Sequence, residues 1–132
     1  MFGAKHQEEN EKLRAEVDRL AGLSLPQLAS ELMEKGFGPG GPAGDGQHAE
    51  LPSIAGALNP AEGSFLDDNL LLEHFRVVAE GAQLLEHAGL VRFEVFSSGD
   101  VAHWSWTATR AGVTALQQNA VASLLERPAA GV

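Results

Sequence analysis

The apolar stripe between Leu66 and Ala88 constrains the fold of this chain more than any other part of its sequence. Apolar residues recur in it at a four-three-four-three spacing: Leu71, Phe75, Val78, Ala82 and Leu85. An α-helix turns once in about 3.6 residues, so this spacing predicts a long helix that is buried along one side. Asp67 or Asp68 is its expected N-cap, and Gly89 followed by Leu90 predicts a Schellman ending.

After this helix the spacing of apolar residues changes to strict alternation, in one run at 91–95 and another at 102–106. A period of two is typical of a β-strand. The sequence from Ser97 to Asp100 contains glycine between the two runs and favours a chain reversal. We therefore predict an antiparallel hairpin with Trp104 and Trp106 on one face.

The N-terminal segment 7–23 is rich in helix-forming residues and predicts an amphipathic helix. Asn10, Leu13, Val17 and Leu20 share one seam of it. Two interpretations stay open for this seam. It is either a short coiled coil, with Asn10 as a polar residue at an a position, that joins two copies, or an ordinary apolar face packed on its own domain. In the first case the four residues form a dimerisation surface.

The rest of the chain contains shorter sequence patterns that predict helix ends and loops. Ser24 and Gln27 predict a capping box at the start of a helix that ends at Gly36. Glycine and proline dominate 36–46, which indicates a flexible linker or loop, and 51–60 suits either a short strand or one helical turn. Thr109 is the expected N-cap of a last helix over about 110–125, which Pro128 ends.

Together these elements predict an α+β, helix-rich fold in three parts. Residues 1–35 form an N-terminal helical and dimerisation segment, 36–50 a Gly/Pro-rich linker, and 51–128 a domain with a two-stranded antiparallel ribbon. A chain of 132 residues is long enough for one ordinary hydrophobic core.

The second half of the chain resembles winged-helix proteins such as the MarR and PadR regulators. The resemblance is carried by Leu85-Glu86, by Gly89-Leu90-Val91 before the ribbon, and by the Thr-x-x-Gly sequence from Thr109 to Gly112 after it. It covers about half of the chain, and its motifs are structural. It implies a winged-helix-like domain in which the ribbon is the wing, and it makes a DNA-binding transcriptional regulator one candidate function.

In such a regulator the helix at 66–88 would enter the major groove, where base edges and phosphates require donors and cations. That helix carries five acidic residues against Arg76 alone, and Arg92 is the single arginine of the wing. The whole chain has 9 basic and 18 acidic residues, and its net charge of −9 repels phosphate. Arg76 and Arg92 are therefore the DNA-contact candidates, but charge favours a different partner.

Two features that the sequence lacks indicate where in the cell the protein is found. The chain has no cysteine, which removes disulfides and thiolate chemistry and suits a reducing compartment. No uninterrupted apolar run approaches the roughly 20 residues that cross a bilayer. We expect a soluble, cytoplasmic protein that makes no membrane contact.

Motifs that carry catalytic chemistry lack their required context. Residues 36–41 match G-x-G-x-x-G, but a helix precedes them instead of a strand, and Pro39 removes a backbone donor. The histidines are not spaced as metal ligands, and Glu80 with His87 on one helix face is more typical of solvated surface. We therefore expect no catalytic residues, no cofactor and no metal, and a protein that is not an enzyme.

Trp104 and Trp106 dominate the main aromatic cluster. On a hairpin that lies over helices they belong first to the core, because such side chains bury a large apolar area, whereas the alternative is an exposed patch that binds a partner. The sequence favours a non-catalytic protein-interaction or regulatory module. We expect a homodimer formed through the N-terminal helix, the long helix or both, with another protein as a further partner and DNA-binding regulation as the alternative function.

Overall fold

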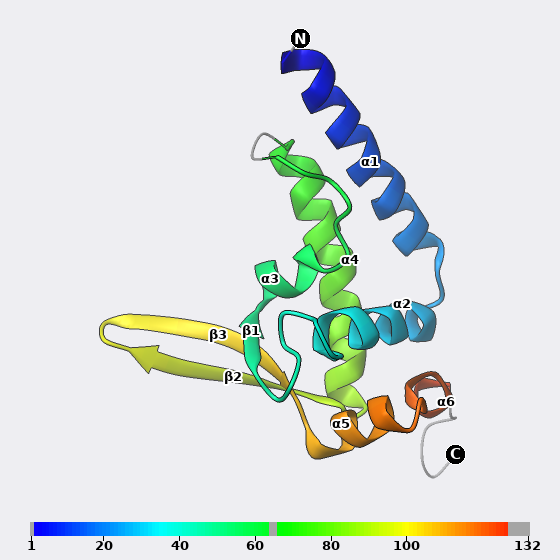
Figure 1. Cartoon of the computed structure of the whole chain (residues 1–132), viewed down its shortest axis with the longest axis vertical. Helices are drawn as coiled ribbons and strands as arrows, with labels where there is room; N and C mark the ends of the chain where they lie inside the picture. Colours follow the sequence, from blue (N-terminus) through cyan, green and yellow to red (C-terminus); the bar gives the residue numbers. More distant parts are fainter. Residues whose placement is uncertain (1, 64–65, 127–132) are drawn as a thin grey trace.

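The structure, a computed structural model, describes residues 2–63 and 66–126 and has an α+β fold (Figure 1). In order along the chain, its elements are α1 (Phe2–Gly22), α2 (Leu25–Leu32), the π-helix η1 (Met33–Phe37), β1 (His48–Glu50), α3 (Leu51–Gly56), α4 (Asp68–His87), β2 (Val91–Ser98), β3 (Val101–Ala108), α5 (Arg110–Gln117) and α6 (Val121–Leu125). The α+β class predicted from the sequence is confirmed. The expected helix end at Pro128 lies outside the described residues.

Helix α4 is the long helix that the apolar stripe predicts, and both predicted ends are confirmed. The Asp67 carboxylate accepts hydrogen bonds from the backbone N–H groups of Asn69 and Leu70. At the other end the Leu90 N–H donates to the Leu85 carbonyl at 2.9 Å, which is the Schellman pattern. Gly89 takes a φ of +76° there, so the chain leaves the helix and enters β2 at once.

Helix α2 packs across the middle of α4 at Gly81. A Cβ atom at this position would lie 3.3 Å from Leu28 Cγ and 3.4 Å from Leu32 Cδ2, so the glycine allows close contact between the two helices. The buried side of α4 is turned slightly from the predicted stripe: Phe75 is half-buried, and its neighbour His74 is buried. The stripe therefore locates the helix correctly and its buried side approximately.

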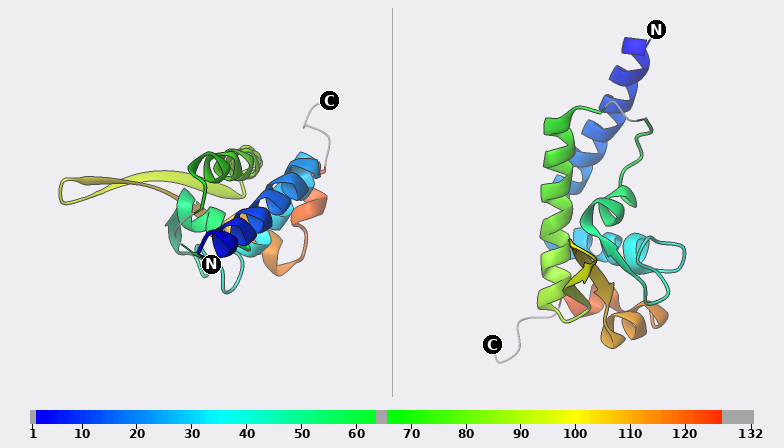
Figure 2. Two further views of the ribbon diagram at one scale, coloured as in Figure 1. Left: turned by 90° about the horizontal axis from the view of Figure 1, so that it is seen from above. Right: turned by 90° about the vertical axis from the view of Figure 1, so that its left-hand side faces the viewer.

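Strands β2 and β3 form the predicted antiparallel hairpin, with Gly99 at a φ of +64° and Asp100 in its two-residue turn. Strand β1 was not predicted, because three residues are too few to show an alternation. The sheet order is β1-β3-β2, and β1 pairs only with residues 105–107 of β3. The outer half of the hairpin is therefore a two-stranded ribbon that runs out from the helical body (Figures 1 and 2).

Helix α1 begins earlier than predicted and packs against α4 of its own chain (Figure 1). Leu13 and Leu20 are fully buried, and Val17 forms a small cluster with Leu13 and Leu70. Asn10 Oδ1 accepts a hydrogen bond from the backbone N–H at position 67, at 2.9 Å. Of the two interpretations of the seam, packing on its own domain is the one found.

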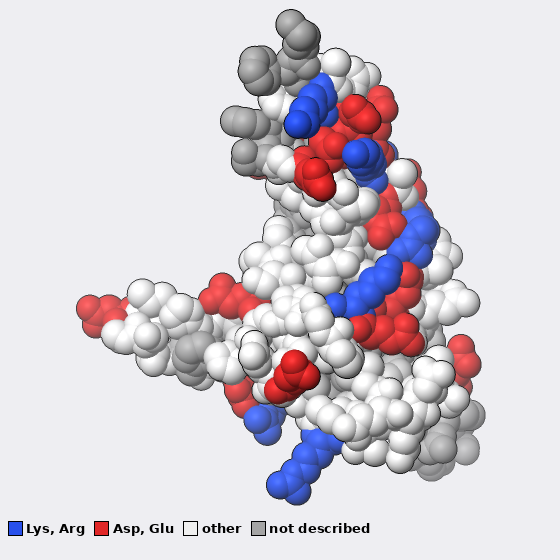
Figure 3. All heavy atoms as spheres, in the orientation of Figure 1, with Lys and Arg blue, Asp and Glu red and all other residues white. Residues whose placement is uncertain are grey.

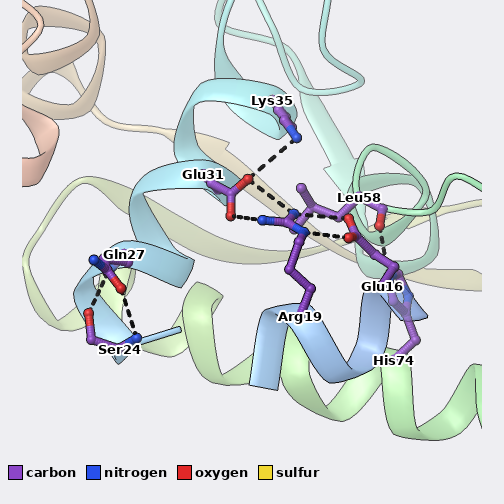
Figure 4. Close-up of polar contacts among 8 residues, drawn as sticks. All are labelled: Glu16, Arg19, Ser24, Gln27, Glu31, Lys35, Leu58 and His74. Carbon is purple, nitrogen blue, oxygen red and sulfur yellow. Dashed lines mark hydrogen bonds and ion pairs between the residues drawn. The ribbon is translucent and has the colours of Figure 1, made fainter. Parts of the chain in front are cut away.

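The start of α2 is confirmed, but its predicted end is wrong. The Ser24 hydroxyl accepts from the Gln27 N–H, and the Gln27 side chain accepts from the Ser24 N–H, which completes the capping box (Figure 4). The chain then continues through Gly36 as η1 and ends its helical course at Phe37. A Cβ at Gly36 would lie 3.2 Å from Ile54 Cγ2, so this glycine serves packing and not termination.

Of the two alternatives for the Gly/Pro-rich segment, a linker or a loop, the structure has a loop that packs on the core. The Ala43 N–H donates to the Gly36 carbonyl at 2.9 Å, and Ala43 is fully buried. Ala43 shares one hydrophobic core with Leu20 and Ile54, so buried residues of 1–35, 36–50 and 51–126 pack together. Of the two alternatives for 51–60, the helical one is found, as α3.

The prediction of one helix over 110–125 is wrong, because the chain breaks between α5 and α6. Asn119 has a φ of +54°, and the Ala120 N–H donates to the Ala115 carbonyl at 2.8 Å. This is a second Schellman ending, with asparagine at the left-handed position that it tolerates better than most residues. The break turns α6 back toward α2.

Thr109 and Gly112 attach the base of the hairpin to the end of α4. Thr109 is the predicted N-cap: its hydroxyl accepts from the Gly112 N–H at 3.0 Å and donates to the Gly89 carbonyl at 2.6 Å. A Cβ at Gly112 would clash with the Leu90 carbonyl oxygen. The two sequence motifs on either side of the hairpin therefore meet in space and hold its base.

Candidate functional site

The two faces of the hairpin differ in charge. Directly paired residues of an antiparallel ladder lie on the same face, so the register of β2 and β3 assigns every residue to one side. One side, which we call the aromatic face, carries no charged residue and consists of Val91, Phe93, Val95, Ser97, Ala102, Trp104, Trp106 and Ala108. In a chain of net charge −9 this is an unusual surface.

The outer half of the aromatic face is open to solvent. Trp104 is 61% exposed and Val95 is 53% exposed. Nearer the body, Phe93 and Trp106 are half-buried, and the ring centroid of Phe93 lies 5.7 Å from that of Trp104 and 5.0 Å from that of Trp106. The expectation that both tryptophans belong to the core is therefore wrong for Trp104, because the ribbon extends beyond the helices that could cover it (Figure 1).

Two pairs of polar side chains lie on the opposite face of the hairpin. Arg92 Nε lies 2.7 Å from Glu94 Oε1, and His103 Nδ1 lies 2.9 Å from Glu50 Oε1 of β1. Val101 is also on this side and is 57% exposed. Arg92, one of the two DNA-contact candidates, is thus held against a carboxylate.

Arg19 joins α1 to α2 through two carboxylates (Figure 4). Its Nε lies 2.6 Å from Glu16 Oε1, and its Nη1 lies 3.0 Å from Glu31 Oε2. These hydrogen bonds raise the pKa of the guanidinium, and the bond from Arg19 is the main cause that lowers the pKa of Glu31. The network links α1 to α2, and it leaves little free positive charge at Arg19 for a polyanion.

Other cations are neutralised in the same way. Lys12, Arg14 and Lys35 form ion pairs with Glu9, Glu73 and Glu31. Figure 3 shows the result as blue and red side chains interleaved along the α1 side of the molecule. Arg76, the other DNA-contact candidate, is exposed on α4 and has no ion pair within 2–63 and 66–126, but it lies on a different element from Arg92.

Four polar side chains of the described residues are buried, Glu9, His74, Ser105 and Thr107, and among them His74 and Ser105 were not anticipated from the sequence. A ring nitrogen of His74 lies 3.2 Å from the Leu58 carbonyl oxygen, and burial lowers the pKa of the imidazole. Ser105 Oγ is the only buried side-chain polar atom of the described residues that lacks a hydrogen-bond partner. The spacing of apolar residues does not tell whether a polar residue between them is buried, so neither side chain could be identified in this way.

The part of the chain that the structure describes has neither a metal-binding cluster nor a membrane-spanning helix. No three histidine, cysteine, aspartate or glutamate side chains gather there as a metal site requires. None of the described helices is both long and apolar enough to cross a membrane. The G-x-G-x-x-G sequence runs from η1 into the loop and does not join a strand to a helix.

Comparison with protein families, with curated proteins and with solved structures found no match to this chain.

Proposed function

We propose that this chain is a non-catalytic, winged-helix-like interaction module in which two copies associate through the aromatic faces of their hairpins. The observation that carries the proposal is the exposed and uncharged outer half of that face, centred on Trp104. Protein interfaces are enriched in aromatic residues and depleted of charge at their centres, and tryptophan is frequent among the residues that dominate binding. The outer aromatic face has both properties.

The arrangement of the elements supports the winged-helix part of the proposal. Helices α3 and α4 precede the hairpin, and β1 pairs with the base of β3, so the helix pair and the ribbon form one unit. The motifs that carry the sequence resemblance hold the base of the ribbon to α4. In this account the ribbon is a wing whose partner is a protein surface.

A second copy is the partner that the charge distribution fits. Two molecules of net charge −9 repel each other, but their aromatic faces can meet without bringing two carboxylates into direct opposition. A two-fold axis brings the same patch of both copies together, so Trp104 and Val95 of each copy would pack against each other. The seam of α1 is not available for this contact, because Leu13 and Leu20 are already buried.

The expected dimer is weak. A stable complex usually buries about 800 Å² on each partner, whereas only two large apolar side chains of the aromatic face are exposed, Val95 and Trp104. The association should therefore depend on protein concentration, with the monomer favoured at low concentration. Such behaviour suits a regulated contact better than an obligate one.

Sedimentation equilibrium of the full chain and of Trp104→Ser tests the proposal. We expect the mass of the natural sequence to rise toward that of a dimer with concentration, and the variant to remain monomeric. Val101→Ser is the matched control, because Val101 is exposed on the same hairpin but on the opposite face. It should dimerise like the natural sequence.

Two results would overturn the proposal. One is a natural chain that stays monomeric at about 1 mM, well above the range of weak specific complexes. The other is an equal effect of the Val101 and Trp104 substitutions, which would indicate general loss of folding and not loss of an interface. A complex that forms only on addition of duplex DNA, and that Arg76→Ala abolishes, would favour the DNA-binding regulator instead.

A further inference from the structure

A second surface feature, a pocket between the glycine-rich loop and α5, involves none of the residues of the aromatic face. Its volume is about 650 Å³, which is within the range of small-molecule sites. The residues that line it include Glu34, Phe37, Asp45, Val113, Leu116 and Asn119. They come from η1, the loop, α5 and the turn after α5.

One wall of the pocket is a chain of tight turns. Gly38, Gly41, Gly44 and Gln47 are joined by three hydrogen bonds, each from a backbone N–H to the carbonyl three residues earlier. In the last turn Asp45 and Gly46 have φ values of +58° and +77°, as a type I′ turn requires. Cβ atoms at the three glycines of the series would clash with backbone carbonyl oxygens, so this course of the chain requires glycine at each of them.

The apolar part of the lining comes from η1 and α5. Val113 and Leu116 lie one turn apart on α5 and are half-buried, and Phe37 of η1 lies almost fully buried beside them. An apolar group of a ligand that replaced water here would gain roughly 25 cal/mol for each Å² removed from solvent. The pocket therefore suits a ligand with an aromatic or branched body.

The polar groups at the pocket are acidic or neutral. The lining residues include two acidic ones, Glu34 and Asp45, and two amides, Gln117 and Asn119, all of them exposed, whereas no lysine or arginine lines the pocket in the described part of the chain. Within that part neither carboxylate has an ion pair, unlike Glu31 on the neighbouring turn. Asp45 and Asn119 are held in left-handed turns by the backbone, so the positions of both polar groups are restricted before a ligand arrives.

We infer that this pocket binds a small organic cation that combines an ammonium group with an apolar body. The carboxylates of Glu34 and Asp45 would receive the ammonium, and the half-buried side chains of Val113 and Leu116 would receive the apolar part. The inference is independent of the hairpin, because a monomer has the complete pocket.

The test uses three probes that share an indole ring and differ in charge: tryptamine, tryptophol and indole-3-propionate. Each is titrated into the full chain, with ¹H–¹⁵N spectra recorded at low ionic strength, where exposed ion pairs are least screened. We expect tryptamine to bind most tightly and indole-3-propionate most weakly. The largest shifts should be at residues 34–46 and 113–119.

Two variants assign the charge preference. Glu34→Gln and Asp45→Asn should each weaken tryptamine binding by about two- to fivefold, the effect of an ion pair that is open to solvent, and should leave tryptophol unchanged. Asparagine tolerates the left-handed backbone at position 45, so the turn is retained. Glu86→Gln, an exposed carboxylate of α4 that does not line the pocket, is the matched control and should have no effect.

Equal affinity for the three probes, or preference for the anion, would overturn the inference. So would shifts confined to residues outside the pocket. A loss of tryptamine binding in Glu86→Gln as large as in Glu34→Gln would also count against it, because it would show a response to total charge and not to this site.

Discussion

Apolar side chains are buried in the helical body but exposed in the outer half of the hairpin. In the body Leu13 and Leu20 are fully buried, although α1 is highly charged and its seam is narrow. In the hairpin Val95 and Trp104 are more than half exposed, although the alternation there is equally regular. The periodicity of apolar residues therefore predicts which residues share a face. Whether that face is buried depends on how far the helices beneath it extend.

The difference predicts a large contrast in stability between matched truncations. Leu32→Ala in the body should lower the free energy of unfolding by about 2–5 kcal/mol, because Leu32 is fully buried between α2 and α4 and a cavity would remain. Val95→Ala in the hairpin should lower it by less than about 0.5 kcal/mol at monomer concentrations. Urea denaturation measures both, and similar losses would contradict the division into body and ribbon.

The junction between the two regions should be nearly as sensitive as the core. Gly112→Ala introduces a Cβ that clashes with the Leu90 carbonyl oxygen at the base of the hairpin, and we expect a loss of about 1–3 kcal/mol. Gly56→Ala is the control, since a Cβ there meets nothing within 4 Å, and it should be neutral or slightly stabilising. Thermal unfolding of both variants tests this, and a neutral Gly112→Ala would mean that the hairpin is not anchored as described.

A smaller effect should appear when the body is titrated with acid. Burial lowers the pKa of His74 below its ordinary value of 6.5, while the Leu58 carbonyl and the Glu16 carboxylate act in the opposite direction. As pH falls through 6.5 the unfolded chain takes up the proton first, so stability should decrease with falling pH and level off below the pKa of the folded state. The lowered pKa of Glu9 and Glu31 adds a further loss only at more acidic pH.

Denaturation curves between about pH 8 and pH 5.5 isolate the histidine contribution. His74→Gln, which keeps a donor for the Leu58 carbonyl, should remove most of the slope in this range. His87→Gln changes an exposed histidine of the same helix and should leave the slope in place. A slope that survives in His74→Gln would show that another group is responsible.

The smallest predicted effect on stability concerns the hydroxyl groups of Thr107 and Ser105, which lie on the same face of β3. Thr107 Oγ1 donates to the Gln47 carbonyl at 3.1 Å, whereas Ser105 Oγ has no hydrogen-bond partner among the residues that the structure describes. Thr107→Val should therefore cost about 1 kcal/mol of stability, and Ser105→Ala should be neutral or stabilising. If Ser105→Ala is the more damaging of the two, the hydroxyl has a partner that the packing described here does not include.

Much of the fold could be predicted from the sequence because its signals are local. The capping box at Ser24, the N-caps at Asp67 and Thr109, and the Schellman ending at Gly89 each depend on a few neighbouring residues, and all are found. The failures involve contacts between distant segments. Gly36 packs against Ile54 instead of ending a helix, and β1 exists only because β3 lies beside it.

The candidate sites were harder to predict for the same reason. The alternation placed Trp104 and Trp106 on one face, but their different exposure depends on where the helical body ends beneath the ribbon. No sequence motif predicts the pocket. The glycines at 38, 41 and 44 indicate a loop, and only the folded chain brings that loop against α5.

The environment of Trp104 at rising protein concentration tests the central claim most directly. In the variant Trp106→Phe, Trp104 is the only tryptophan, and acrylamide quenching of its fluorescence reports its exposure alone. We predict strong quenching at about 1 μM and clear protection toward about 1 mM, as the aromatic faces of two copies meet. Quenching that stays equally strong over the whole range would contradict the assignment of the aromatic face as the interface.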